Sequence, residues 1–348
     1  MIVYWFYFAF LSILSISPIK LELNLSKILK FLLLFSLVIF IGLRYEVGGD
    51  WDIYEFDFKN NIEYFNFIEI NYVRDFGYEF LSYLIFALGF EIYILNFLLA
   101  ALFIYSLNKF INFVTDNHWL AFLISFPYII IVVSMGFTRQ GVAFSFVLLS
   151  LIAINDKKII KYLILTFTGM LFHKSAALII PFIFLTYFKL KFINLISFIA
   201  LTFISTLIIY PEISRVAAGY FSENSKYISS GVYYRLFLNI LAGFIFLIFY
   251  KFIKFNNNFD KLIIYIFIAN LILIYFSLNY STFVDRIIIY FTFIQTVVFS
   301  RIYLIYPKFK IIFNLTIILI YCLIFLIWLN YSNHSYAWLP YKNIIFQF

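Results

Sequence analysis

The sequence is a succession of apolar runs, each about 15 to 20 residues long, separated by short polar stretches. Wound as an α-helix, a run of this length covers most of the roughly 30 Å hydrocarbon thickness of a bilayer. The runs lack the alternation of apolar and polar residues that marks the strands of an outer-membrane barrel. Mean hydropathy is +1.00 and 65% of the residues are hydrophobic, which is more apolar surface than a soluble domain buries. The sequence therefore predicts an all-α, polytopic integral membrane protein.

We predict about twelve transmembrane helices in a single transmembrane domain that covers residues 1–348. The predicted spans are 2–17, 28–43, 91–107, 119–135, 140–154, 159–172, 175–188, 192–209, 236–250, 262–278, 287–303 and 311–329. The stretch from Tyr78 to Gly89 is apolar but short, and it fits a re-entrant or interfacial helix better than a span. The first run has no basic segment before it and no small-residue cleavage site after it, so we expect it to be retained. The one cysteine, Cys322, lies in an apolar run, which excludes a disulfide within the chain.

The distribution of basic residues predicts the orientation of these spans. Short loops rich in lysine face the cytoplasm in most membrane proteins. On that basis both termini and the loops 44–90 and 210–235 lie outside. The cytoplasmic side then carries 14 Lys and one Arg against four acidic residues, and the outer side carries four Lys and six Arg against thirteen acidic residues. The net charge of +8 comes mostly from cytoplasmic lysines, so it gives no reason to expect nucleic acid as a partner.

The preference for arginine over lysine on the outer side has no explanation in topology alone. A guanidinium group binds phosphate or carboxylate at two points and stays charged when it loses water, whereas the lysine ammonium is a hydrated point charge. The outer arginines therefore predict a site that handles anions. They are Arg44, Arg74, Arg139, Arg215, Arg235 and Arg286.

Four sequence motifs fall on this outer side in a recognisable order. They are Arg44-Tyr-Glu-Val-Gly-Gly-Asp50-Trp-Asp-Ile-Tyr54, Thr138-Arg139-Gln140-Gly-Val-Ala143, Phe172-His173-Lys-Ser175 and Asn279-Tyr-Ser-Thr-Phe-Val-Asp285-Arg286, followed by the ending Trp338-Leu-Pro340-Tyr341. Together they resemble the EpsG family over about residues 25 to 345. The loop 210–235 is the part that matches least.

The resemblance implies a Wzy-like polymerase, which joins oligosaccharide repeats into exopolysaccharide, capsule or O-antigen at the outer face of the bacterial inner membrane. It also implies a glycosyltransferase-C-like membrane fold. The implied substrate is an oligosaccharide linked to undecaprenyl pyrophosphate, and no cofactor or metal is expected. The lipid bilayer, a chain-length regulator and the flippase of the same pathway are the implied partners.

Polymerisation moves a glycan from its lipid pyrophosphate to a hydroxyl group of the next repeat. Arginines would stabilise the charge on the departing pyrophosphate, and a base would take the proton of the hydroxyl group. His173, Asp50 and Asp285 are the candidate proton acceptors. The predicted catalytic residues are Arg44, Asp50, Arg139, His173 and Arg286, and the predicted substrate-binding residues are Tyr54, Gln140, Arg235 and Asp285.

Each candidate also has a structural interpretation. Arg44 could anchor a helix end, Asp285 and Arg286 could form a surface pair, and Arg74 could pair with its neighbour Asp75. Asp50-x-Asp52 resembles the metal motif of enzymes that use nucleotide sugars, but those substrates are cytoplasmic. Tyr54 could belong to the aromatic belt at the membrane surface instead of stacking on a sugar.

Two other classes of function stay open. A flippase for lipid-linked oligosaccharide would also present arginines to pyrophosphate, but it would be expected to show internal repeats. A membrane O-acyltransferase would be expected to hold a histidine deep in a channel, whereas His173 is predicted at the outer end of its span.

Overall fold

The computed structural model describes residues 1–17, 23–64, 75–187, 204, 229, 231–255 and 257–346. Across these ranges every regular element is a helix, and a single β-bridge joins Arg44 to Asn343. The predicted all-α class is therefore confirmed. Helices suit the apolar runs because a helix satisfies its own backbone hydrogen bonds where no water is present to do so.

The helices follow one another along the whole chain. In chain order they are α1 (Ile2–Ile16), α2 (Leu23–Gly42), α3 (Trp51–Tyr64), α4 (Phe76–Ala87), α5 (Ile92–Val114), α6 (His118–Ser125), η1 (Phe126–Gly136), α7 (Thr138–Asn155), α8 (Ile159–Phe172), η2 (Lys174–Ile179), α9 (Phe182–Tyr187), α11 (Gly231–Ile248), α12 (Tyr250–Ile253), α13 (Asn257–Ser277), α14 (Ser281–Ile288), η3 (Ile289–Phe291), α15 (Phe293–Phe299), η4 (Ile302–Leu304), η5 (Pro307–Phe309), α16 (Lys310–Tyr331), η6 (Ser335–Trp338) and η7 (Ile344–Phe346). Of these, η1 is a π-helix that continues α6, and the other η elements are 3₁₀ turns.

Several of these helices are long and apolar enough to cross a membrane, so the chain is a multi-pass membrane protein. In the part of the chain that the structure describes there are seven, or eight if a pair bent by 47° counts as one span. The seven are Asn24–Gly42, Ile92–Val114, His118–Gly136, Thr138–Asn155, Gly231–Ile248, Asn258–Ser277 and Pro307–Tyr331.

The described residues do not support the predicted count of about twelve spans. The predicted spans 2–17 and 159–172 form helices of 15 and 14 residues, and such helices reach only about 20 Å at 1.5 Å per residue. The predicted span 175–188 divides into the 3₁₀ turn η2 and the six-residue helix α9, and 287–303 is the bent pair. The predicted span 192–209 lies outside the described ranges. The short helix predicted at Tyr78–Gly89 is present as α4.

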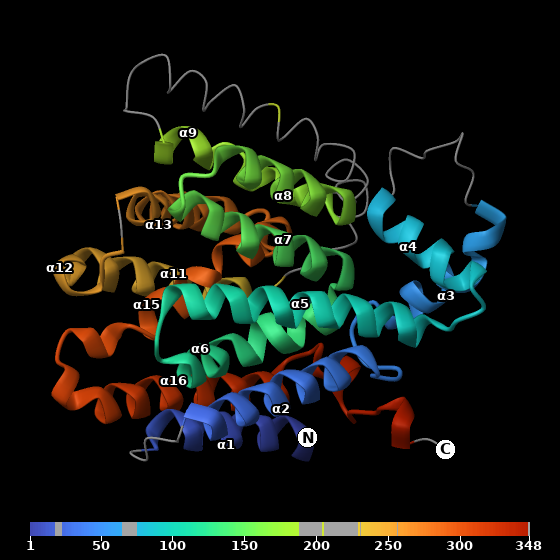
Figure 1. The fold of residues 1–348 in the computed structure, drawn as a ribbon, viewed down its shortest axis with the longest axis horizontal. Helices are drawn as coiled ribbons and strands as arrows, with labels where there is room; N and C mark the ends of the chain where they lie inside the picture. Colours follow the sequence, from blue (N-terminus) through green and yellow to red (C-terminus); the bar gives the residue numbers. More distant parts are fainter. Residues whose placement is uncertain are drawn as a thin grey trace.

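The loops fall into two groups at opposite ends of the bundle. Figure 1 shows α3 and α4 at one end and α12 at the other. At the α12 end, Arg301 donates hydrogen bonds to the carbonyl oxygens of Val114 (2.9 Å) and Lys254 (3.2 Å), so three loops predicted as cytoplasmic meet there. At the α3 end, the hydroxyl of Tyr4 donates to the carbonyl of Trp338 (2.7 Å), so the two terminal segments lie together. This grouping agrees with the predicted topology, and which end faces outward stays a prediction.

A buried hydrogen-bond network joins the helices in the middle of the bundle. Gln295 on α15 donates to Asn239 on α11 (2.8 Å) and accepts from Tyr321 on α16 (2.6 Å), and Asn239 donates to Asn270 on α13 (2.9 Å). All four side chains are buried. Polar groups in an apolar interior are stable only when paired, so this network fixes how the four helices pack.

We predict that Asn239→Leu destabilises the fold. The change removes both hydrogen bonds of Asn239 and leaves amide groups of Gln295 and Asn270 without their partner, which costs about 1–3 kcal/mol for each such group. Thermal unfolding of the purified protein in detergent measures the loss. The control is Asn330→Leu, because Asn330 is exposed and bonds only its own helix at Leu326. Equal melting temperatures of the Asn239 variant and the control would contradict this prediction.

Candidate functional site

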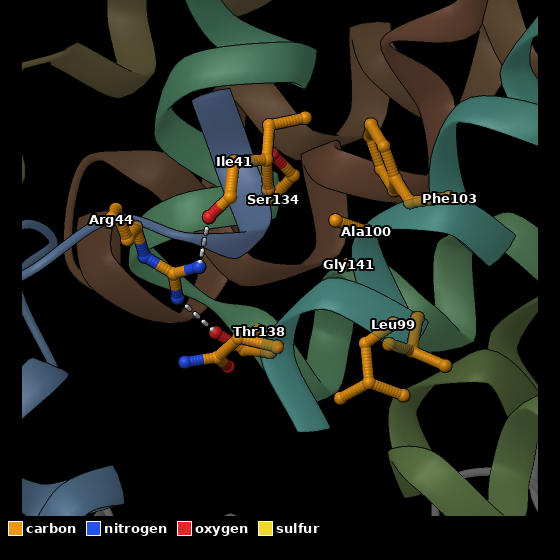
Figure 2. Close-up of a pocket in the computed structure, with 10 residues that line it drawn as sticks. Ile41, Arg44, Leu99, Ala100, Phe103, Ser134, Thr138 and Gly141 are labelled. Atoms are coloured by element: carbon orange, nitrogen blue, oxygen red, sulfur yellow. Dashed lines mark hydrogen bonds between the residues drawn. The ribbon is translucent and has the colours of Figure 1, made fainter. Parts of the chain in front are cut away.

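Arg44 lies directly after α2 and is buried, with 1% of its surface exposed. Its guanidinium group donates to the carbonyl oxygens of Val47 (3.0 Å, from Nε) and Ile41 (2.6 Å), and to Oγ1 of Thr138 (2.9 Å). Figure 2 shows the side chain reaching from the end of α2 to Ile41 and to Thr138 at the start of α7. Burial lowers the pKa of Arg44 to about 10, so the group remains charged at neutral pH. The donors that were predicted to bind pyrophosphate are engaged by protein oxygens.

A small cavity lies beside Arg44 (Figure 2). Its polar lining comes from Asn96, Ser134 and Thr138, and its volume is about 10 Å³. That is close to the smallest space that holds one water molecule. The cavity is therefore too small for a sugar or a phosphate group.

The segment 337–344, which we call the C-terminal clasp, holds the loop that follows Arg44. Backbone hydrogen bonds run from Tyr45 to Lys342 (3.1 Å), from Gly48 to Ala337 (2.7 Å) and from Ile344 to Leu43 (3.0 Å).

Glycines let the clasp and the loop approach each other closely. Gly48 has a φ of 119°, a conformation that side chains disfavour. The indole of Trp338 fills the space beside Gly49 and Gly136, and a Cβ atom on Gly136 would lie 2.5 Å from that ring. The position of Asp50, which follows Gly49, therefore depends on the clasp.

Asp50 is half-buried at the start of α3. Its carboxylate makes no hydrogen bond and no ion pair with any residue that the structure describes. Burial raises the pKa of the Asp50 carboxyl above its ordinary value of 3.8, and the guanidinium groups of Arg286 and Arg139 offset part of that rise. Asp50 is thus a carboxylate within electrostatic reach of two arginines but in direct contact with neither.

Arg139, the second residue of α7, is held by α3 and α4. Its guanidinium group forms an ion pair with Asp75 (3.5 Å) and lies over the rings of Tyr54 (5.4 Å) and Tyr78 (5.8 Å). The sequence around Arg139 contains no acidic residue, and its acidic partner Asp75 comes instead from the start of α4. Tyr54, predicted to bind substrate, is buried against Arg139 and Tyr78. Arg74 lies outside the described ranges.

Arg286 differs from the other arginines of the site because its guanidinium group is available. It is half-buried and lies 3.9 Å above the ring of Phe137, and it makes no hydrogen bond or ion pair in the parts of the chain that the structure describes. Its backbone carbonyl accepts a hydrogen bond from the side-chain amide of Gln140 (2.8 Å). Gln140, which was predicted to bind substrate, is 1% exposed and instead ties α7 to α14.

Arg235 and Asp285, both predicted to bind substrate, pair with each other. Nε of Arg235 donates to Oδ1 of Asp285 (2.7 Å), and its Nη2 contacts the same oxygen. The hydroxyl of Ser229 donates to Oδ2 (2.8 Å), and the guanidinium group lies 4.6 Å over the ring of Tyr128. The alternative in which Asp285 pairs with its neighbour Arg286 is therefore wrong.

His173 ends α8 and caps η2. Its Nδ1 accepts a hydrogen bond from the backbone N–H of Ser175 (3.3 Å) and lies 2.5 Å from the Ser175 hydroxyl, which in turn lies 2.8 Å from the hydroxyl of Tyr290. The end of α8 also meets α4, because a Cβ on Gly77 would lie 3.0 Å from the carbonyl oxygen of Leu171. His173 therefore lies at the end of the bundle that carries Asp75 and Arg139.

Several residues of this site were not among the predicted set. Thr138, Ser175 and Trp338 lie inside the motifs quoted above, so the sequence could have indicated that they belong to the site. Asp75 and Tyr290 gave none, because their partners Arg139 and Ser175 are distant in sequence. In the described ranges no group of three His, Cys, Asp or Glu residues could hold a metal ion.

The fold and this site define a multi-pass membrane protein with arginines and a carboxylate gathered at one end of its helices. The chain belongs to the EpsG family, whose family model matches residues 27–343. Members of this family are Wzy-like polymerases. No curated protein and no solved structure matches the chain.

We predict that Arg44→Lys destabilises the protein and that Arg286→Lys does not. Lysine at position 44 cannot reach the three oxygens that the guanidinium group bonds, and each buried acceptor left unpaired costs about 1–3 kcal/mol. Arg286 has no such partner to lose. Thermal unfolding in detergent compares the two variants, and equal losses in both would contradict the structural difference between the arginines.

We also predict that Asp50→Asn stabilises the fold at neutral pH. Because folding raises the pKa of Asp50, the ionised carboxyl lowers stability above that pKa, and the penalty disappears as the pH falls towards the ordinary value of 3.8. The gain in melting temperature from Asp50→Asn should therefore shrink as the pH is lowered. A gain that grows on acidification would show that the pKa is lowered instead.

Proposed function

We propose that this protein joins oligosaccharide repeats carried on undecaprenyl pyrophosphate into a surface polysaccharide, at the outer face of the bacterial inner membrane. The observation that carries the proposal is that the guanidinium group of Arg286 lies within electrostatic reach of the carboxylate of Asp50, and that neither group makes a hydrogen bond or ion pair with another described residue, at the end of the bundle that holds the family motifs. Membership of a family of Wzy-like polymerases supports the same reaction class.

Arg286 is the proposed ligand of the departing pyrophosphate. Its guanidinium group lies over the ring of Phe137, with Cζ 3.9 Å from the ring centroid, and its N–H donors bond to no residue that the structure describes. Two parallel hydrogen bonds to phosphate oxygens would stabilise the charge that grows there as the sugar leaves. Arg139 adds positive charge next to the same carboxylate, although Asp75 offsets part of it.

Asp50 is the proposed proton acceptor. In the reaction, an acceptor hydroxyl oxygen bonds to the anomeric carbon of the donor sugar, and the bond from that carbon to the pyrophosphate oxygen breaks. Pyrophosphate leaves with the electron pair, and the hydroxyl proton passes to Asp50. A raised pKa makes this carboxylate a better base than an exposed aspartate.

Arg44, Gln140 and Tyr54 are proposed to position the site without touching the substrate. Arg44 fixes the start of α7 through Thr138, and Gln140 fixes the start of α14 through the carbonyl of Arg286. Tyr54 supports the guanidinium group of Arg139. These contacts hold the starts of α7 and α14 and the side chain of Arg139 in place.

Arg235 and Asp285 are proposed to anchor the substrate-contacting loop 210–235. Asp285 and Ser281 bind the side chain and the backbone N–H of Ser229, near the end of that loop. Residues 231–235 belong to α11, and residues 210–228 and 230 lie outside the described ranges. We also propose that this loop contacts the sugars, that both termini face outward and that the fold is glycosyltransferase-C-like. The proposed protein partners are a flippase and a chain-length regulator.

The test is Arg286→Lys, which keeps the charge and loses the two-point geometry. A charge-assisted hydrogen bond contributes about 1.5–3 kcal/mol, so polymer synthesis should fall roughly ten- to a hundredfold while single lipid-linked repeats accumulate. Polymer length on gels and the lipid-linked pool measure both effects. Lys59→Arg is the control, because Lys59 is exposed and pairs only with Glu55.

Polymer of normal length and yield from Arg286→Ala would remove Arg286 from the active site. Accumulation of repeats on the cytoplasmic face instead of the outer face would show that the protein is a flippase.

A further inference from the structure

The six-membered ring of the Trp338 indole packs against two glycines that are far apart in the sequence. Gly49 belongs to the loop before α3, and Gly136 ends η1. A Cβ atom on Gly136 would lie 2.5 Å from Cζ2 of the indole, and a Cβ atom on Gly49 would lie 3.5 Å from its Cη2. Both glycines therefore face the outer edge of the same ring.

Each of these glycines directly precedes a residue of the proposed site. Gly49 precedes Asp50, the proposed proton acceptor. Gly136 precedes Phe137, whose ring centroid lies 3.9 Å from Cζ of Arg286. Asp50 is within electrostatic reach of that guanidinium group. One side chain thus touches the backbone next to Asp50 and the backbone next to the ring on which Arg286 rests.

Trp338 is itself held by three helices. Its carbonyl oxygen accepts from the hydroxyl of Tyr4 on α1 (2.7 Å), and its Nε1 donates to the carbonyl of Ile131 on η1 (3.4 Å). Its ring packs edge-on against Trp328 of α16, with 5.5 Å between the ring centroids. Only 4% of its surface is exposed. A ring packed in this way cannot move aside without disturbing its neighbours.

The two backbones that the ring touches also meet each other directly. A Cβ atom on Gly48 would lie 2.4 Å from the carbonyl oxygen of Met135. The N–H of Gly48 donates to the carbonyl of Ala337, the residue before Trp338 (2.7 Å). The loop is therefore held at two adjacent residues, Gly48 and Gly49, against the end of η1 and the indole ring.

We infer that Trp338 is a positioning residue of the site, and that its indole ring is the spacer that sets the distance between Asp50 and Arg286. The inference rests on the proposed function for the roles of those two groups in the reaction. A base and a ligand of the leaving group need a fixed separation, because a displacement of about 1 Å can lower a rate roughly a hundredfold. Trp338 acts only through the backbone that it touches, at Gly49 and Gly136.

A size exchange between positions 136 and 338 tests the spacer. In Gly136→Ala the added methyl group meets the indole, and in Trp338→Phe the shorter ring no longer reaches the positions of Cζ2 and Cη2. Either change alone displaces the two segments, so polymer synthesis by the full-length protein in membranes should fall roughly tenfold or more. In the double variant the methyl group takes up part of the space that the indole leaves, and most of the loss should be recovered.

The comparison of single and double variants separates spacing from other effects of the change. Both Trp338→Phe and the double variant lose the Nε1 contact with Ile131, so that contact cannot explain a difference between them. Protein level and thermal unfolding in detergent are measured for each variant. The control is Trp119→Phe, because Trp119 is half-buried on α6, near the α12 end of the bundle. A double variant no more active than Trp338→Phe at equal protein level would overturn the inference.

The spacing can also be measured without any activity. Asp50 and Arg286 attract each other, so the changes in melting temperature from Asp50→Asn and Arg286→Gln should not add, and the difference reports how close the two groups are. This coupling should be present in the wild-type protein, smaller in Trp338→Phe, and restored when Gly136→Ala is added. Equal coupling in the three backgrounds would overturn the inference whatever reaction the protein catalyses. The expected coupling together with normal polymer from Arg286→Ala would support the spacer and overturn the proposed function instead.

Discussion

The buried guanidinium group of Arg44 is the interaction on which the rest of this site depends. A charge at the end of a membrane helix is stable in a buried position only if several oxygens surround it, and here Ile41, Val47 and Thr138 provide them. Those oxygens belong to α2, to the loop after it and to α7. One side chain therefore sets the relative position of the segments that carry Asp50 and Arg139, and the arginine that we propose to bind the anion is a different residue, Arg286.

The arginines at this end of the bundle divide by their partners. Arg44 bonds backbone and hydroxyl oxygens, Arg139 and Arg235 bond carboxylates, and Arg286 rests on an aromatic ring. Their shared preference over lysine therefore has more than one cause. Planar geometry and several N–H donors suit a buried structural contact as well as a phosphate group. The arginine count led to the prediction of an anion site, but only the surroundings of each arginine separate a proposed ligand from a structural contact.

Hydropathy predicted the membrane class, the helical fold and most of the long helices, because each depends on residues close together in the sequence. The prediction of membrane spans from hydropathy failed where the helix is too short to cross the membrane, as in α8, and where it is bent, as in the pair of α14 and α15. The roles of the predicted site residues stay predictions, and the partners that the structure gives them could not be predicted from the sequence. Thr138 lies 94 residues from Arg44, and Tyr290 lies 115 residues from Ser175. Such pairs cannot be predicted from a local sequence pattern, because they form only when α7, α8 and α14 pack together.

The C-terminal clasp has a consequence for how the protein is made. The loop that carries Asp50 is synthesised long before residues 337–344 exist to bind it through Gly48 and Tyr45. Until the clasp arrives, the backbone N–H groups of Tyr45 and Gly48 lack the carbonyl oxygens of Lys342 and Ala337, and the indole of Trp338 is missing from the space beside Gly136. The site is therefore assembled only after α16 has been inserted. A partly synthesised chain, with every preceding helix in place, therefore still lacks the contacts that hold the loop of Asp50.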